Sequence, residues 1–304
     1  MFKFNHNFLD RDSLSRTDPV AIKNRLASTK SKLILFNNRY QVLMQPDGLH
    51  LTNAKHLANI PDSKQWIYLG HSEFDPDEPW FCARVNDSEF ELSHHQQWHD
   101  LRLSLPSITE PTASIVAYAK ALLYWHSQHK HCGKCGAKAE VHMSGHERHC
   151  PACDHTMYPR TDPAIIIAVT YNEQLLLARQ ASWPKARYSV LAGFVEPGES
   201  FEHAAIREVK EESGLDIHFP KYFASQPWPF PCSIMIGFLA EAKHQNLALL
   251  DQELEHAVWV SPENIGSLLS NGELKLPTYG SISHALIEHW ANTHQLNLSR
   301  WIDN

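Results

Sequence analysis

The 304-residue sequence predicts a mixed α and β protein, with an α+β domain, a cysteine-rich segment and an α/β domain in that order. Three observations support this prediction. Short apolar runs alternate with turn-forming residues over the first 125 positions, two Cys-x-x-Cys pairs follow, and from residue 161 strand-like apolar runs alternate with helical segments. Because typical domains have about 100–200 residues, we place the domains at residues 1–125, 126–160 and 161–304.

Composition and charge narrow the class of protein. Apolar residues make up 43% and charged residues 20% of the chain, as in ordinary globular proteins. The formal net charge of −7 disfavours a general nucleic-acid or membrane-surface binder, which would carry a basic excess. The longest purely apolar stretch, residues 164–169, is much shorter than the about 18 residues of a membrane span. The N-terminus does not resemble a secretory signal. We therefore expect a cytoplasmic protein without a membrane partner.

Residues 1–125 contain no recognisable motif, but their pattern predicts strands and one long helix. Three short apolar runs predict strands: residues 32–36, 65–69 and 79–85. Residues 112–128 predict a helix, because apolar side chains recur there at helical spacing. Thr112 or Ser114 would cap its start. This mixture indicates a strand-rich α+β domain.

The C-terminal 144 residues predict strands and helices in alternation. Apolar runs predict five strands: residues 164–169, 175–178, 188–192, 233–240 and 257–260. Residues 199–213 predict a helix that Gly214 ends, and residues 282–293 predict another. Ser261 and Pro262 provide a cap and a first-turn proline for a short helix between them. This order of elements is typical of an α/β domain.

Four cysteines form two Cys-x-x-Cys pairs, separated by 14 residues: Cys132, Cys135, Cys150 and Cys153. Four thiolates at this spacing close a tetrahedron around one Zn²⁺, which makes a structural site without an open position. A redox pair is the alternative, but it needs only one Cys-x-x-Cys. One of six nearby histidines is an alternative ligand. Since the chain has no basic excess, we expect the zinc ribbon to join the two halves rather than to bind nucleic acid.

The helix predicted at residues 199–213 carries a cluster of acidic side chains. Glu208 and Glu212 fall on one row, Glu211 lies on its flank, and the neighbouring row is apolar. Clustered carboxylates beside a packed face are costly unless a cation neutralises them. Mg²⁺ prefers such oxygen ligands, and Arg207 lies one turn before Glu211, where it can pin a carboxylate. The alternative is a solvated acidic helix face.

Residues 193–215 resemble the Nudix box at every defining position, from Gly193 and Glu199 to the aliphatic Val209 and Leu215. In that family, the loop-helix-loop binds Mg²⁺ or Mn²⁺, and water attacks a diphosphate that is linked to a nucleoside. The resemblance implies a Nudix α/β/α sandwich with a mixed sheet.

The same resemblance implies roles for individual residues. The catalytic set is Arg207, Glu208, Glu211 and Glu212, with Glu211 as metal ligand or proton acceptor. The implied ligands of Mg²⁺ or Mn²⁺ are Glu208, Glu212, Glu253 and the backbone carbonyl of Ala192. Trp259 sets the register that selects Glu253, and Glu255 is the competing residue.

A proline-rich segment follows the box, with three prolines in the five residues from 227 to 231. These prolines stiffen the segment and prevent regular ladder pairing. Trp228 and Phe230 then present flat faces on which a base can stack. A stiff turn with aromatic residues of the core is the alternative.

Residues 225–233 resemble the S-Q-P-W-P-F-P-x-S sequence of the NADH pyrophosphatase branch of the Nudix family. The four-cysteine ribbon and residues 158–163 also resemble that branch. The resemblance implies a Nudix-like N-terminal domain, a homodimer, cleavage of NADH to NMNH and AMP, and removal of NAD caps from RNA. Cys232 occupies the variable position. The implied substrate-binding residues are Tyr158, Gln226, Pro227, Trp228, Pro229, Phe230, Pro231, Cys232, Ser233 and Ser283.

We therefore expect a metal-dependent hydrolase of the diphosphate bond of NAD(H), with NAD-capped RNA as a further substrate. Mg²⁺ or Mn²⁺ would serve catalysis, and one Zn²⁺ per chain would serve structure. A Nudix pyrophosphatase for ADP-ribose, FAD or a diadenosine polyphosphate is the first alternative. A non-catalytic nucleotide sensor or RNA-binding module that uses the ribbon is the second. Every carboxylate of the box is present, which argues against the sensor.

Overall fold

The computed structural model describes residues 3–4, 6, 8–53, 66–86, 90–249 and 253–298. The chain divides into two compact units. The C-terminal unit comprises Met1–Lys3, Asp162–Pro227 and Ser233–Asn304, and the N-terminal unit comprises Phe4–Thr161 and Trp228–Cys232. The cysteine-rich segment thus belongs to the N-terminal unit. Residues 228–231 of the proline-rich segment, and Cys232 after them, belong to that unit as well, although they lie far along the chain.

The N-terminal unit contains a mixed sheet. Over the described residues, its strands are β1 (Leu9–Asp10), β2 (Lys32–Phe36), β3 (Val42–Gln45), β4 (Gly48–Leu49), β5 (Ile67–Ser72), β6 (Pro79–Arg84) and β7 (Gln97–His99). They follow the order β1-β5-β6-β2-β3-β4, and β7 pairs with β3. The central pair, β2 and β6, is parallel, while β2 and β3 are antiparallel. The strands predicted at residues 32–36 and 79–85 are therefore confirmed as β2 and β6. The strand predicted at residues 65–69 is β5, which begins at Ile67 and ends at Ser72, and residue 65 lies outside the described residues.

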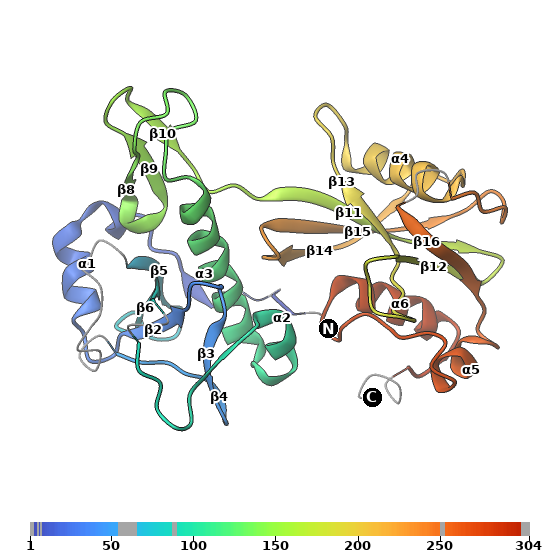
Figure 1. The fold of residues 1–304 in the computed structure, drawn as a ribbon, viewed down its shortest axis with the longest axis horizontal. Helices are drawn as coiled ribbons and strands as arrows, with labels where there is room; N and C mark the ends of the chain where they lie inside the picture. Colours follow the sequence, from blue (N-terminus) through green and yellow to red (C-terminus); the bar gives the residue numbers. More distant parts are fainter. Residues whose placement is uncertain are drawn as a thin grey trace. The chain divides into compact units, whose positions relative to one another are not determined.

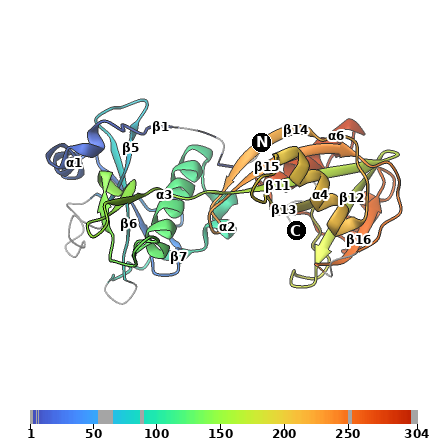
Figure 2. The same ribbon diagram turned by 90° about the horizontal axis from the view of Figure 1, so that it is seen from above.

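Helices cover both faces of this sheet. Its helices are α1 (Pro19–Leu26), α2 (Leu101–Ser104) and α3 (Glu110–Gln128), and short 3-10 turns occupy Ser15–Thr17, Leu105–Ser107 and Met143–Gly145. Successive residues of β2 alternate between the two faces of the sheet. Ile34 packs in the apolar core that includes residues of α3, and Leu35 packs in the core that includes residues of α1. Figures 1 and 2 show α1 and α3 on opposite sides of the strands.

Helix α3 begins earlier than the sequence predicts. Its N-cap is Thr109, and Pro111 lies in the first turn. Thr112 and Ser114 are therefore inside the helix, and the prediction that one of them caps it is wrong. A proline in the first turn suits a helix start, because that position needs no backbone N–H donor.

A three-stranded antiparallel ribbon carries the cysteines. Its strands are β8 (Glu140–His142), β9 (Glu147–Cys150) and β10 (His155–Met157), in the order β10-β9-β8. Two histidines join the ribbon to the rest of its unit. Nε2 of His146 lies 2.7 Å from the carbonyl of Tyr68 on β5, and Nε2 of His126 on α3 lies 2.8 Å from the carbonyl of Gly145.

The C-terminal unit contains a second mixed sheet. Within the described residues, its strands are β11 (Asp162–Tyr171), β12 (Gln174–Gln180), β13 (Leu191–Phe194), β14 (Lys221–Trp228), β15 (Ser233–Glu241) and β16 (Leu254–Val260). The order is β14-β15-β11-β12-β16, and β13 pairs with β11. Strands β11 and β15 are parallel over nine residue pairs. The sheet is therefore mixed, as the sequence predicts.

Helices lie on both faces of this sheet: α4 (Phe201–Ser213) on one, and α5 (Ile265–Ser270) and α6 (Ile282–Thr293) on the other. Ile165 and Ile167 of β11 pack in the apolar core that includes residues of α4, whereas Ile166 packs in the core that includes residues of α6. Figure 1 shows α4 and α6 on opposite sides of β11. The α/β/α sandwich is confirmed, and the middle of β11, residues 164–169, is apolar because both of its faces are buried there.

The two sheets share one topology without obvious similarity in sequence. The strands β5-β6-β2-β3 of the first sheet correspond to β14-β15-β11-β12 of the second. In each sheet the central pair is parallel, and the first strand of that pair forms an antiparallel hairpin with the next strand. The N-terminal domain thus has the Nudix-like arrangement that the resemblance implies.

Two elements of the C-terminal unit begin three or more residues later than the sequence predicts. The strand expected at residues 188–192 becomes β13 only at Leu191, because Ser189 forms an isolated bridge to Ala178 instead. The short helix expected at Ser261 begins at Ile265. Asn264 and Ser261 exchange hydrogen bonds through side chain and backbone, at 2.8 and 3.3 Å, and these bonds close a turn before the helix. Over the described residues, no helix is long and apolar enough to cross a membrane.

Candidate active site

Helix α4 forms where the box predicts it. The Oγ atom of Ser200 caps the N-terminus by accepting from the N–H of His203 at 3.2 Å. Gly214 ends the helix with a left-handed φ of 73°, and its N–H donates to the carbonyl of Lys210. Ala205 and Val209 are buried against the sheet. The acidic row is therefore fixed at the edge of the packed face.

Arg207 holds the carboxylates of the box together. Its Nε donates to Glu199 at 2.7 Å, and its Nη1 donates to Glu208 at 2.9 Å and to Glu211 at 2.8 Å. Its Nη2 donates to the carbonyl of Phe194 at 2.9 Å, which ties the end of β13 to the helix. The hydrogen bond from Arg207 lowers the pKa of Glu199 to about 2. The guanidinium of Arg207 thus orients three carboxylates and the end of strand β13.

Gly193 allows the Glu208 carboxylate to lie against β13. A Cβ atom at this position would lie 1.9 Å from the carboxyl carbon of Glu208, so a larger residue would displace that side chain. Burial raises the pKa of Glu208, and the negative charges of Glu211 and Glu253 raise it further, while Arg207 opposes them. A cation beside Glu208 would relieve this unfavourable environment.

The donor set suits a hard divalent cation. Glu212 lies one turn after Glu208 and is only 2% exposed, whereas the side chain of Glu211 is 53% exposed. Ala192 lies on β13, the strand that packs beside α4. Carboxylates and a backbone carbonyl are the ligands that Mg²⁺ and Mn²⁺ prefer. The chemistry of these donors therefore suits a metal held by Glu208, Glu212 and the carbonyl of Ala192, and their roles as ligands stay a prediction. Among the described residues, only the four cysteines form a group of three or more side chains whose ligand atoms already converge.

Glu253 and Glu255, the two candidates for a further metal ligand, have different partners in the structure. Glu255 forms an ion pair with Arg179 of β12. Glu253 accepts a hydrogen bond from the side chain of Gln180 at 3.1 Å, and its charge acts on Glu208. Glu253 is therefore better placed to ligate a metal at the box, and its ligand role stays a prediction.

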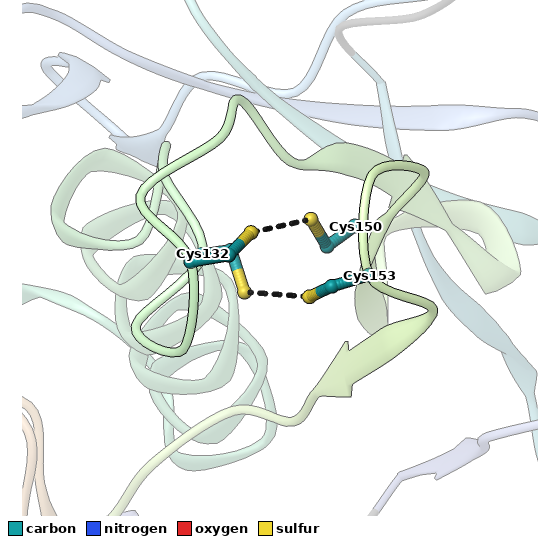
Figure 3. Close-up of side chains that lie close together, drawn as sticks. Cys132, Cys150 and Cys153 are labelled. Atoms are coloured by element: carbon teal, nitrogen blue, oxygen red, sulfur yellow. Dashed lines mark hydrogen bonds between the residues drawn. The ribbon is translucent and has the colours of Figure 1, made fainter.

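The four cysteines converge as the spacing predicts. Their Sγ atoms all lie within 4.8 Å of one another, with Cys132 and Cys153 at 3.7 Å and Cys135 and Cys150 at 3.5 Å. Figure 3 shows the sulfur atoms of Cys132, Cys150 and Cys153 pointing toward one another. Ligands about 2.3 Å from a tetrahedral Zn²⁺ lie about 3.8 Å apart, so this geometry fits structural zinc.

A residue with positive φ follows each pair of cysteines. Gly136 has a φ of 77° and donates its N–H to the carbonyl of Cys132 at 2.9 Å. Asp154 has a φ of 57° and donates to the carbonyl of Cys150, also at 2.9 Å. Gly136 therefore serves the tight turn of the first pair, whereas Gly133 does not have a positive φ.

The proline-rich segment is partly buried in the N-terminal unit. The rings of Trp228 and Phe230 pack edge to face, with centroids 5.0 Å apart, and both contact Phe4. Both rings are half-buried against the core of that unit. The alternative of a stiff turn with core aromatics thus describes part of their environment, and base stacking stays a prediction.

Gln226 and Ser283, two of the predicted substrate-binding residues, are buried and hydrogen-bonded within the protein. Gln226 is fully buried, and its Nε2 donates to the carbonyls of Lys3 and Gly280, while its Oε1 accepts from the N–H of Ile282. Ser283 is also buried, with its Oγ 2.7 Å from that of Ser189. These side chains would affect a substrate through the positions of neighbouring segments.

The remaining predicted residues differ in accessibility. Tyr158 follows the ribbon and is 63% exposed. Pro227 and Pro231 are exposed, Cys232 is half-buried, and Pro229 and Ser233 are buried. Ser233 opens β15 and pairs with Asp162. These positions leave the substrate contacts as predictions.

Phe194 is a candidate that the sequence analysis missed. It ends β13 directly after Gly193, and its ring is 59% exposed although its carbonyl is held by Arg207. A large exposed aromatic ring beside the carboxylate cluster of the box offers a face for a base. Its place next to the box glycine is the signal that was available in the sequence.

Comparisons with known proteins cover all three parts of the chain. A NUDIX domain model matches residues 160–279, an NADH pyrophosphatase-like rudimentary NUDIX domain matches residues 30–125, and an NADH pyrophosphatase zinc ribbon domain matches residues 127–158.

Three characterised relatives show the extent of the similarity. The NAD-capped RNA hydrolase NudC of Stutzerimonas stutzeri is 40% identical over 192 residues, which cover 63% of this chain and 67% of that protein. The NAD-capped RNA hydrolase NUDT12 of Homo sapiens is 30% identical over 335 residues, with coverage of 94% and 72%. The mitochondrial NAD(P)H pyrophosphatase NUDT13 of Homo sapiens is 36% identical over 250 residues, with coverage of 74% and 70%.

Proposed function

The chain belongs to the Nudix family, in the branch of NADH pyrophosphatases and NAD-capped RNA hydrolases, and on that premise we propose that it hydrolyses the diphosphate bond of NAD(H). The products are AMP and NMN(H). The NAD cap at the 5′ end of RNA is a second substrate with the same bond. The carboxylate cluster that Arg207 holds on α4 is the observation that carries this proposal.

In the proposed reaction, the oxygen of a water molecule attacks one phosphorus and the bridging P–O bond breaks. Glu208, Glu212, Glu253 and the carbonyl of Ala192 would hold Mg²⁺ or Mn²⁺. When bound, these ions neutralise phosphate charge and make water a stronger nucleophile. Glu211 is half-exposed beside Arg207 and accepts the proton of the attacking water. Arg207 keeps the carboxylates in register.

The test is product analysis with NADH and Mn²⁺ or Mg²⁺. The wild-type protein should release NMNH and AMP, and Glu208→Gln should lower kcat/KM by about 100-fold or more, the order expected when a directly acting group is lost. Glu202→Gln is the matched control, because Glu202 lies in the first turn of the same helix, outside the carboxylate cluster. Equal activity of the Glu208 variant and the control would refute the proposal.

Parallel assays with NAD-capped RNA, ADP-ribose, FAD and a diadenosine polyphosphate rank the substrates by kcat/KM. We propose that NADH and NAD-capped RNA rank first. Three relatives support this order, since their names give these two substrate classes. We further propose one Zn²⁺ per chain, a homodimer and a cytoplasmic location.

A further inference from the structure

Lys120 on α3 contacts the proline-rich segment directly. Its Nζ donates to the carbonyl of Pro229 at 2.6 Å, and the same atom lies 4.3 Å from the centroid of the Phe230 ring. A charged hydrogen bond and a cation–π contact thus converge on two neighbouring residues. All of these residues belong to the N-terminal unit.

The backbone of the proline-rich segment has few N–H groups that could bond to another element. Prolines at positions 227, 229 and 231 have no backbone N–H, and the N–H of Phe230 donates locally to the carbonyl of Trp228 at 2.7 Å. Carbonyls and ring faces are therefore what other elements can hold. Arg102 of α2 lies 5.6 Å from the centroid of the Trp228 ring, so each aromatic ring faces one cation.

A lysine is a costly choice for this position if its role is only to fill space. Burial lowers the pKa of Lys120 to about 8, which shows that the ammonium loses part of its hydration. An apolar side chain of similar length would pack between α3 and the Phe230 ring without this cost. The cation is therefore better explained by the carbonyl and the ring that it orients.

We propose that Lys120 is a positioning residue for substrate binding, which fixes the Pro229 carbonyl and the Phe230 ring so that the two aromatic side chains present fixed surfaces to a nucleotide base. The inference rests on the proposed function, in which this segment contacts the substrate. Helix α3, which holds the segment, and residues 228–232 belong to the same unit.

The test compares Lys120→Met with Lys120→Arg. Methionine keeps the length of the side chain but removes the ammonium, so we expect KM for NADH to rise by about 10-fold, or about 1.4 kcal/mol, with kcat changed less than about twofold. Arginine retains a cation with donors and should restore most of the affinity. Lys23→Met on the exposed side of α1 removes the same charge elsewhere and serves as the control.

Hydrogen–deuterium exchange provides a readout that does not depend on activity. Peptides that cover residues 224–234 should exchange faster in Lys120→Met than in the wild type, while peptides from α4 should not change. Unchanged exchange in this segment together with an unchanged KM would overturn the inference. So would a fall in kcat and a rise in KM that merely track a loss of thermal stability.

The two proposals fail in different ways. A wild-type protein that releases no NMNH would refute the proposed function, and with it the role in substrate binding. The exchange data would still decide whether Lys120 holds the segment. An active wild type with normal exchange and normal KM in Lys120→Met would refute only the role of Lys120.

Discussion

At the scale of single residues, the candidate site depends on close approach more than on strained backbone. Gly193 is an ordinary strand residue in its dihedral angles, and it is small because the Glu208 carboxylate occupies the space above it. Arg207 fills the opposite role by drawing three carboxylates to one point. The motif specifies both residues, and the structure supplies the physical reason for each.

We predict that Gly193→Ala impairs catalysis without unfolding the protein. The added Cβ would meet the end of the flexible Glu208 side chain, which can move away at little cost to the fold. The carboxylate would then leave its position beside Arg207. We expect kcat/KM for NADH to fall by about 10-fold or more, with a melting temperature within a few degrees of the wild type. Full activity in this variant would contradict the packing described here.

Gln226 marks the limit of prediction at this scale. The sequence places it in a substrate signature, but its amide bonds the backbone of Lys3, Gly280 and Ile282. Two of these partners lie 223 and 54 residues away along the chain. No local pattern of residues encodes such contacts, so the structural use of this side chain could not be predicted.

At the scale of elements, local signals defined the helices and strands that carry chemistry. The apolar row, the cap and the terminal glycine of α4 all lie within the element, and α4 was predicted to within two residues. The short helix after β16 was predicted to begin too early, because Ser261 and Asn264 form a turn by exchanging hydrogen bonds. Serine before proline signals a cap in sequence, but the same atoms also serve a turn.

The zinc ribbon is an element that its metal should stabilise. We predict about one Zn²⁺ per chain by elemental analysis. Cys150→Ser should abolish it and lower the melting temperature, because structural zinc contributes directly to folding. Cys82→Ser removes a buried thiol that is outside the ribbon, so it should retain zinc. A Cys150 variant with full zinc content and unchanged stability would rule out the four-thiolate site.

The attachment of the ribbon should weaken in acid. Nδ1 of His126 accepts from Nε of Arg148 at 3.1 Å, which requires a neutral ring, and burial lowers the pKa values of His126 and His146 to about 4. The unfolded chain takes up these protons near pH 6.5. The free energy of unfolding should therefore fall as the pH drops from about 6.5 to about 4, by about 1.4 kcal/mol per pH unit for each histidine. Below pH 4 these two groups add no further change.

Denaturant titrations from pH 7.5 to pH 4.5 measure this dependence. The acid slope also contains the release of zinc from its thiolates, so the comparison with His126→Gln isolates the contribution of one histidine. Glutamine retains a donor and an acceptor but does not titrate. A variant whose slope equals that of the wild type would show that His126 is not responsible.

At the scale of the whole molecule, sequence motifs predict two of the three domains, whereas the fold of the N-terminal domain is seen only in the pairing of its strands. The spacing of the cysteines predicts a zinc site, because four thiolates must close a tetrahedron around the metal. The Nudix domain was predicted from the resemblance of residues 193–215 and 225–233 to sequences of that family, not from chemistry alone. The N-terminal domain has no such motif, and its shared strand order with the C-terminal sheet is visible only in the pairing of β2 with β6 and of β11 with β15. Pairing between strands far apart in sequence is a tertiary property that local patterns do not specify.

The path of residues 228–232 has a practical consequence for anyone who dissects the gene. The coding sequence of the Nudix domain is continuous, but residues 228–232 fold with the N-terminal unit, where the rings of Trp228 and Phe230 pack against the apolar core. A fragment that begins at residue 161 would expose the rings of Trp228 and Phe230 to water. The N-terminal fragment would lose the two side chains that pack against its core.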